Sequence, residues 1–197
     1  MEKRKGLGIG GSPRIKGNTN LLLREALSGA ESVGMETEIV YACRLENKGC
    51  LSCQGCDETG RCVVQDGMQI LYPKLFEASL ILLASPIYFS GITAQLKAVI
   101  DRSQCIWTAH YRLKQPVCAA LPCRLGGFIS TRGQKGFKVF ESAAIPPRAF
   151  FNTIKAKYTK GLFFDDCDPS GIMQKRPEDR KKAFEYGKGL ARRIITG

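Results

Sequence analysis

The chain has 197 residues, of which 44% are hydrophobic, and this is enough for one domain with a full core. Its 30 Lys and Arg residues outnumber 18 Asp and Glu residues and give a net charge of +12. The longest apolar runs, such as residues 80–84, are too short to span a bilayer, and the charged N-terminus is unlike a secretory signal. We therefore expect a cytoplasmic protein, folded as a single domain over residues 1–197, with no membrane association.

Short apolar segments typical of buried parallel strands alternate with segments that have the periodicity of helices. We expect strands at residues 7–11, 37–41, 79–84, 124–130 and 158–164. We expect helices at residues 18–30, 66–76, 93–101, 136–154 and 177–195. Pro73, Pro146 and Pro147 should kink or break two of these helices. The fivefold alternation predicts an α/β fold, a doubly wound three-layer sandwich around a five-stranded parallel sheet.

Four of the nine cysteines follow the second strand with the spacing C-x2-C-x2-C-x5-C. So many thiolates in one short loop indicate a metal ion, an iron–sulfur cluster or two disulfides. Disulfides are disfavoured in a cytoplasmic chain, and a zinc site usually combines two well-separated C-x2-C pairs. Cysteines at every third residue are closer to the bacterial cluster-binding run, although the last gap is longer. We predict a cubane cluster in a cysteine-rich loop insertion at residues 48–64, with zinc or an empty loop as the alternatives. The predicted ligands are Cys50, Cys53, Cys56 and Cys62.

The other cysteines are interpreted as small buried hydrophobic residues, which is the usual environment of a free cysteine. They are Cys43, Cys105, Cys118, Cys123 and Cys167.

The loop after the first strand, residues 11–19, is rich in hydroxyl groups and opens a helix. It has neither a Walker sequence nor the pattern G-x-G-x-x-G. Backbone N–H groups at the helix start, with Ser12, Asn18 and Thr19, would form a phosphate cradle, to which Arg14 adds charge. The alternative is an ordinary strand-to-helix turn capped by Asn18.

Two further loops follow strands at the same sheet edge, where ligands of such folds bind. The second loop is apolar and aromatic, which suits a flat ring, unless its aromatic residues belong to the core. It contains Pro86, Ile87, Tyr88 and Phe89. The third loop supplies polar groups from Thr131, Arg132 and Gly133. Together with the phosphate cradle, which includes Gly17, these loops predict a site for flavin mononucleotide (FMN).

In combination, the motifs resemble those of the iron–sulfur flavoproteins in the NADPH-dependent FMN reductase family. The matching residues are Gly11-Ser12-Pro13-Arg14 with Gly17-Asn18-Thr19, the four cysteines with Asp66-Gly67-Met68, and Ser85-Pro86-Ile87-Tyr88 with Leu96-Lys97 and Asp101-Arg102. The resemblance implies a flavodoxin-like fold, bound FMN and a [4Fe-4S] cluster. It also implies a homodimer or a dimer of dimers, with the cluster near a subunit interface. The third loop departs from the glycine-rich sequence of that family.

We expect an oxidoreductase that passes electrons between a two-electron donor or acceptor and a one-electron carrier through FMN and the cluster. NAD(P)H is the candidate two-electron substrate. The basic surface suits a small acidic carrier such as ferredoxin, whereas no basic and aromatic motif indicates nucleic acid. Arg44, Lys48 and Arg61 are expected to offset the charge of the cluster. No acid or base is needed, and His110 is interpreted as a structural or surface residue.

Two alternatives stay open from the sequence. One is an NAD(P)H-dependent FMN or quinone reductase whose cysteine loop holds no functional cluster. The other is a binding module without enzymatic activity, in which zinc braces the loop.

Overall fold

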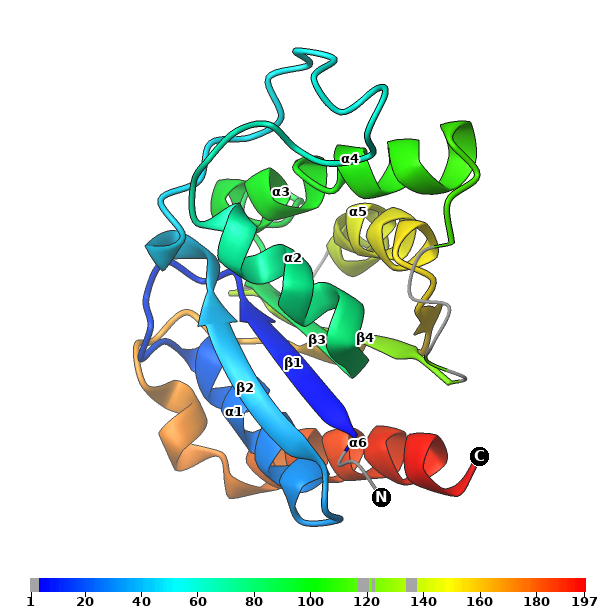
Figure 1. Cartoon of the computed structure of the whole chain (residues 1–197). Coiled ribbons are helices and arrows are strands. Elements are labelled where there is room, and N and C mark those ends of the chain that lie inside the picture. Colours follow the sequence, from blue (N-terminus) through cyan, green and yellow to red (C-terminus); the bar gives the residue numbers. More distant parts are fainter. Residues whose placement is uncertain (1–3, 117–120, 122, 134–137) are drawn as a thin grey trace.

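The computed structural model describes residues 4–116, 121, 123–133 and 138–197. Its centre is a parallel sheet with the order β2-β1-β3-β4-β5, and β6 lies beside the carboxyl end of β4 (Figure 1). All five strand pairs run parallel. The strands are β1 (Lys5–Gly10), β2 (Glu36–Tyr41), β3 (Ala78–Pro86), β4 (Leu125–Thr131), β5 (Lys157–Tyr158) and β6 (Leu162–Phe164).

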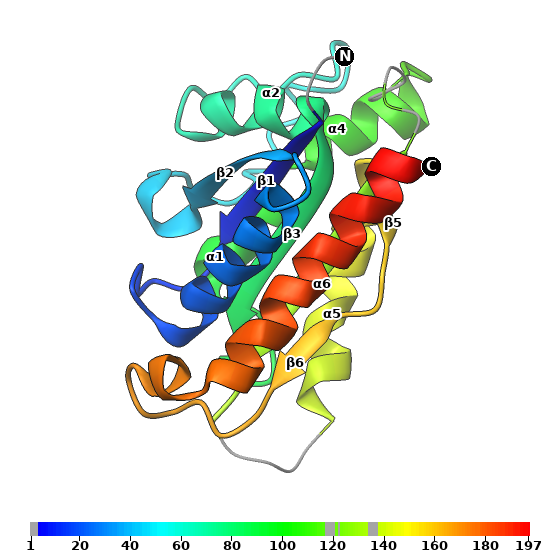
Figure 2. The same cartoon turned by 90° about the horizontal axis from the view of Figure 1, so that it is seen from below.

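Helices cover both faces of this sheet. On one face α1 packs along α6, and on the other lie α2, α3 and α5 (Figures 1 and 2). The helices are α1 (Asn18–Glu31), α2 (Met68–Glu77), α3 (Ala94–Asp101), α4 (Gln104–Trp107), α5 (Val139–Thr153) and α6 (Pro177–Thr196). Shorter turns are η1 (Ala42–Arg44), η2 (Thr108–Arg112), which has π-helical hydrogen bonding, and η3 (Ile172–Lys175). The predicted doubly wound three-layer architecture is confirmed.

The hydrophobic core has two layers because β3, the central strand, is buried on both faces from Ala78 to Ser85. Ile81 and Leu83 face the layer under α2, α3 and α5. Leu80 and Leu82 face the layer under α1 and α6. A continuous apolar run is what a strand in this position requires, so the sequence pattern located it well.

The fifth strand differs from the prediction, because residues 158–164 form two short strands. β5 pairs with Leu125 and Gly126 at the start of β4, and β6 pairs with residues 129–131 at its end. Between them the backbone N and the Oγ1 of Thr159 both bond to the carbonyl oxygen of Gly126, at 2.9 and 3.0 Å. The chain then leaves the ladder and rejoins it at Leu162.

The predicted break at Pro146 and Pro147 is wrong, since α5 continues through both residues. α2 likewise continues through Pro73. Burial explains α5, in which Phe150 and Phe151 are packed in the core. Tertiary packing of one helix face outweighs the hydrogen bonds that proline cannot donate.

Within the described ranges, none of the helices combines the length and the apolar character that crossing a bilayer requires.

Candidate functional site

The loops after β1, β3 and β4 meet at the carboxyl edge of the sheet and line one cavity of about 310 Å³. The loops are tied together by buried bonds. Thr93 Oγ1 donates to the carbonyl oxygen of Gly11 at 2.7 Å, and the backbone N of Ile87 donates to that of Thr131 at 2.8 Å. Eleven of the twelve residues predicted to bind FMN line the cavity. They are Ser12, Arg14, Gly17, Asn18, Thr19, Pro86, Ile87, Tyr88, Thr131, Arg132 and Gly133.

The start of α1 borders this cavity and is suited to an anion. Gly17 is the N-cap residue, no side chain caps the helix, and its first turn contains no acidic residue. The capping role considered for Asn18 is therefore wrong. Ser12 is buried and its Oγ accepts from the backbone N of Arg14 at 3.2 Å, while Thr19 Oγ1 lies 2.5 Å from Thr131 Oγ1. Uncapped N–H groups with hydroxyl neighbours form the kind of cradle that binds phosphate.

The loop after β3 makes a tight turn from Tyr88 to Gly91, which are joined by two backbone hydrogen bonds of 3.0 Å. The central residues Phe89 and Ser90 have φ of 47° and 63°, as in a type I′ turn. Non-glycine residues in this region cost about 1–3 kcal/mol each, so the surrounding structure must impose the turn. This turn leaves Phe89 fully exposed at its tip, so Phe89 is the one residue of the predicted FMN-binding set that does not line the cavity.

Sequence reasoning missed one wall of the cavity, which the segment after β6 supplies through Cys167, Asp168 and Ser170. The Asp168 carboxylate lies against Gly133, where a Cβ atom would be 2.1 Å from Oδ1, so any larger residue there would require this carboxylate to move. Burial raises the pKa of the Cys167 thiol to about 11. No motif marks this segment, and its position at the carboxyl end of a strand was the signal that could have found it.

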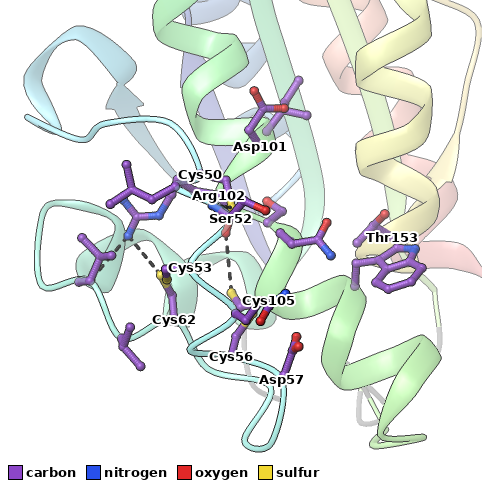
Figure 3. A pocket seen from close by; sticks show the side chains of 18 of the residues that line it. Cys50, Ser52, Cys53, Cys56, Asp57, Cys62, Asp101, Arg102, Cys105 and Thr153 are labelled. Atoms are coloured by element: carbon purple, nitrogen blue, oxygen red, sulfur yellow. Dashed lines mark hydrogen bonds between the residues drawn. The ribbon is translucent and has the colours of Figure 1, made fainter.

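A second cavity, of about 540 Å³, lies beneath the cysteine loop and beside α3, α4 and α5 (Figure 3). The four predicted ligands and Cys105 all line it. Every cysteine in the described ranges is a free thiol, whereas Cys118 lies outside them. Among the described residues, no three His, Cys, Asp or Glu side chains are gathered closely enough to hold a single metal ion.

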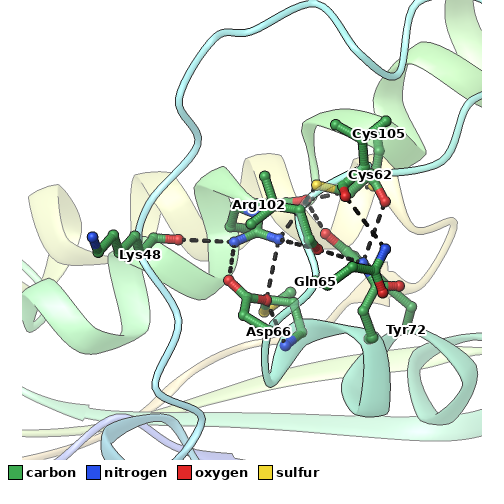
Figure 4. A network of polar contacts seen from close by, with 11 residues as sticks. Lys48, Cys62, Gln65, Asp66, Tyr72, Arg102 and Cys105 are labelled. Carbon is green, nitrogen blue, oxygen red and sulfur yellow. Dashed lines mark hydrogen bonds and ion pairs between the residues drawn. The ribbon is translucent and has the colours of Figure 1, made fainter.

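Arg102, which directly follows α3 and is 2% exposed, is a cation in contact with one of these thiols. Its Nη2 donates to Cys62 Sγ at 3.3 Å, and its guanidinium forms an ion pair with Asp66 (Figure 4). Burial alone would raise the pKa of Asp66, but the hydrogen bonds from Arg102 and from the backbone N of Met68 hold it below its ordinary value. Burial would lower the pKa of Arg102, but its bonds to Asp66 and Cys62 raise it.

The charges at the cysteine cavity thus differ from those predicted. Arg102 and Arg112 line it, and Arg112 pairs with Asp57 at 2.8 Å. Arg44, Lys48 and Arg61 are exposed and are not among the described side chains that line it. The signal for Arg102 was its place in the Asp101-Arg102 motif, but spacing alone does not show which thiol a distant arginine reaches.

Residues 5–151 match the sequence profile of the NADPH-dependent FMN reductase family. The chain belongs to this family of flavin-dependent oxidoreductases. A protein from Archaeoglobus fulgidus named iron-sulfur flavoprotein is 36% identical over 96% of this chain and 92% of its own length.

Other iron-sulfur flavoproteins match over shorter regions. One from Methanocaldococcus jannaschii is 45% identical over 51% of this chain and 52% of its own length. One from Methanosarcina thermophila is 38% identical over 58% of this chain and 60% of its own. The chain thus spans little more than half the length of these two relatives.

Solved structures share the fold at low sequence identity. An NAD(P)H:quinone oxidoreductase from Methanothermobacter marburgensis has a TM-score of 0.74 and 16% identity, with 96% of both chains covered. An FMN-dependent NADH-azoreductase from Bacillus anthracis, solved with FMN, has a TM-score of 0.69 and 13% identity, with 95% and 100% covered. An archaeal flavodoxin has a TM-score of 0.57 and 12% identity, with 97% and 99% covered. The fold is flavodoxin-like, as predicted.

Proposed function

We propose that this protein is an oxidoreductase that passes electrons between FMN, bound at the carboxyl edge of the sheet, and a [4Fe-4S] cluster bound by the cysteine loop. The observation that carries the proposal is the position of the two cavities at opposite ends of α3. Thr93, the N-cap of α3, bonds to the phosphate loop through Gly11, and Arg102, its C-cap, lines the cysteine cavity. An eight-residue helix is about 12 Å long, so one short rigid element joins the two sites.

For FMN, the phosphate would bind at the uncapped start of α1, beside the hydroxyls of Ser12 and Thr19. Arg14 is exposed at the cavity and would add positive charge. Pro86, Ile87 and Tyr88 would form an apolar wall for the ring. These residues fit the cofactor that the family uses.

For the cluster, the proposed ligands are Cys50, Cys53, Cys56 and Cys62, which share one cavity as free thiols. Four thiolates around one zinc ion at about 2.3 Å would lie about 4 Å from one another. In a cubane each thiolate binds a different iron, so the sulfurs surround a larger space. A spacious cavity with a guanidinium donating to one sulfur fits the second arrangement, as do the names of the relatives.

When bound, FMN would exchange electrons in pairs or singly and the cluster would exchange them one at a time. The chain would supply orientation and electrostatics. Tyr88 and Ile87 would shield the ring, the free end of α1 would neutralise the phosphate, and Arg102 would donate to Cys62. NAD(P)H is the proposed two-electron substrate.

The test is anaerobic purification followed by absorption spectroscopy and by iron and sulfide analysis. We expect flavin bands, a broad shoulder at about 400 nm, and about four iron and four sulfide per chain. Cys53→Ser should lose the shoulder and keep the flavin bands, whereas the control Cys123→Ser, outside the cavity, should keep both. Flavin bands alone would favour a flavin or quinone reductase without a cluster. Neither signal would favour the zinc-braced binding module.

The proposed one-electron partner is a small acidic carrier such as ferredoxin. The net charge of +12 and the exposed side chains of Arg44, Lys48 and Arg61 near the cysteine loop support it. Electron transfer to such a carrier should slow as ionic strength rises from 50 to 500 mM, and an unchanged rate would count against this docking. A homodimer or dimer of dimers and a cytoplasmic location stay predictions.

A further inference from the structure

We propose that Arg102 is a positioning residue: it holds the two ends of the cysteine loop together before any cofactor binds, and it raises the reduction potential of the bound cluster. The second part rests on the proposed function, and the first part does not.

One guanidinium bonds to both sides of the loop (Figure 4). Before the first cysteine, its Nη1 donates to the carbonyl oxygen of Lys48 at 3.2 Å. After the last cysteine, its Nη2 donates to that of Val64 at 3.4 Å, and the same atom donates to Cys62 Sγ at 3.3 Å. Arg102 therefore closes the loop at its base, much as a covalent cross-link would, and thereby sets the outline of the cavity.

The guanidinium itself is held firmly. Asp66 binds it in a two-pronged ion pair, with Nη2 3.2 Å from Oδ1 and Nη1 bonded to Oδ2. Asp66 Oδ1 also accepts from the backbone N of Met68 at 3.0 Å, so the carboxylate is fixed to the start of α2. The carbonyl oxygen of Arg102 accepts from Tyr72 at 2.8 Å and from Cys105 at 3.5 Å. A buried donor with both its backbone and its side chain anchored needs no rearrangement to meet a thiolate.

The consequence for the cluster follows from charge. Reduction adds negative charge to the cluster and its sulfurs, and N–H donors to a sulfur stabilise that state. Asp66 compensates the charge of Arg102, so the directed N–H···S bond is the main effect. The Nε of Arg102 is buried without a hydrogen-bond partner in the described part of the chain. Lysine could not replace this planar fork, because its ammonium cannot bond along both sides of the loop.

The first experiment uses protein from which iron has been removed with a chelator. Hydrogen–deuterium exchange of residues 48–66 is compared in wild type, Arg102→Gln, Arg102→Lys and the control Arg61→Gln, which removes an exposed charge within the loop. We expect protection in this segment to fall tenfold or more in both Arg102 variants and to stay unchanged in the control. Unchanged protection in the Arg102 variants would overturn the positioning role.

A lone Asp66 left in Arg102→Gln could unfold the protein, so Arg102→Met combined with Asp66→Leu provides a second variant without a buried charge. It should keep the exchange protection of α1 and α6 and lose that of residues 48–66. If residues 48–66 stay protected in this folded variant, the positioning role is wrong.

The second experiment measures the midpoint potential of the cluster by a redox titration followed by electron paramagnetic resonance. Arg102→Lys and the double variant should shift to more negative potential, and Arg61→Gln should not. Equal potentials in all four proteins would overturn the tuning role. A wild type that never holds iron would refute the proposed function, while the exchange result would still decide the positioning role.

Discussion

The side-chain Nδ2 of Asn18 lies 2.9 Å from the carbonyl oxygen of Cys167, 149 positions further along the chain. The same atom donates to the carbonyl oxygen of Pro169 at 2.9 Å, and Asn18 Oδ1 accepts from the backbone N of Met173 at 3.3 Å. The side chain predicted to bind phosphate is therefore occupied with holding the segment after β6 against the start of α1. Because that segment lines the proposed FMN cavity, the contact gives Asn18 a structural role in the site.

Replacing Asn18 with Ala should weaken both folding and FMN binding. Three hydrogen bonds are lost, and the groups left without partners cost about 1–3 kcal/mol. We expect a lower melting temperature and an FMN dissociation constant at least tenfold higher, measured by fluorescence titration. Asn18→Asp should be worse, since its carboxylate would face two carbonyl oxygens.

The control for this change is Asn152→Ala, which removes an exposed amide from α5. It should leave both quantities unchanged. An Asn18→Ala variant with the melting temperature and FMN affinity of wild type would show that the segment is held by other contacts.

Features that a local sequence pattern defines could be predicted from the sequence. The apolar run of β3 and the hydroxyl-rich loop with Ser12 and Thr19 could be interpreted directly from the sequence. The missed features all depend on partners far away in sequence. Asn18 reaches Cys167, Arg102 reaches Cys62, and α5 tolerates two prolines because its neighbours bury Phe150. Only the folded chain shows these pairings.

Replacing Asp66 with Asn should destabilise the fold by about 3–5 kcal/mol, because it leaves the buried charge of Arg102 without its partner. The pKa of Asp66 is held below its ordinary value of 3.8, so the native state binds this proton less tightly than the unfolded chain. The stability that the ionised Asp66 carboxylate adds to the folded state is complete above pH 3.8 and is lost as pH falls through the lower native pKa. Urea unfolding of wild type at pH 7, 5 and 3 should show this loss.

In Asp66→Asn the unfolding free energy should fall less steeply between pH 5 and pH 3 than in wild type. The control Asp101→Asn, which removes an exposed i,i+4 pair with Lys97, should cost less than about 1 kcal/mol and keep the wild-type slope. If the unfolding free energy depends on pH equally in wild type and Asp66→Asn, protonation of this carboxylate does not change the stability of the fold.

Cys167 should resist alkylation in the folded protein. Burial raises the pKa of its thiol to about 11, so at pH 8 only about one thiol in a thousand is ionised. Its rate with iodoacetamide, followed by mass spectrometry, should rise about tenfold per pH unit between pH 8 and 10. Bound FMN should slow it further, since Cys167 lines the cavity. Modification at pH 8 as fast as that of the exposed Cys50 in iron-free protein would contradict this.

Two glycines in α6 should respond oppositely to the same substitution. A Cβ at Gly187 would lie 1.8 Å from the carbonyl oxygen of Ala26, because α1 and α6 touch there through their backbones. At Gly189 a Cβ would meet nothing within 4 Å. Gly187→Ala should therefore destabilise the protein by about 1–3 kcal/mol or more through overpacking. Gly189→Ala should stabilise it by about 0.5–1 kcal/mol, since alanine favours a helix. Urea unfolding measures both, and changes of the same sign would refute the close contact between the helices.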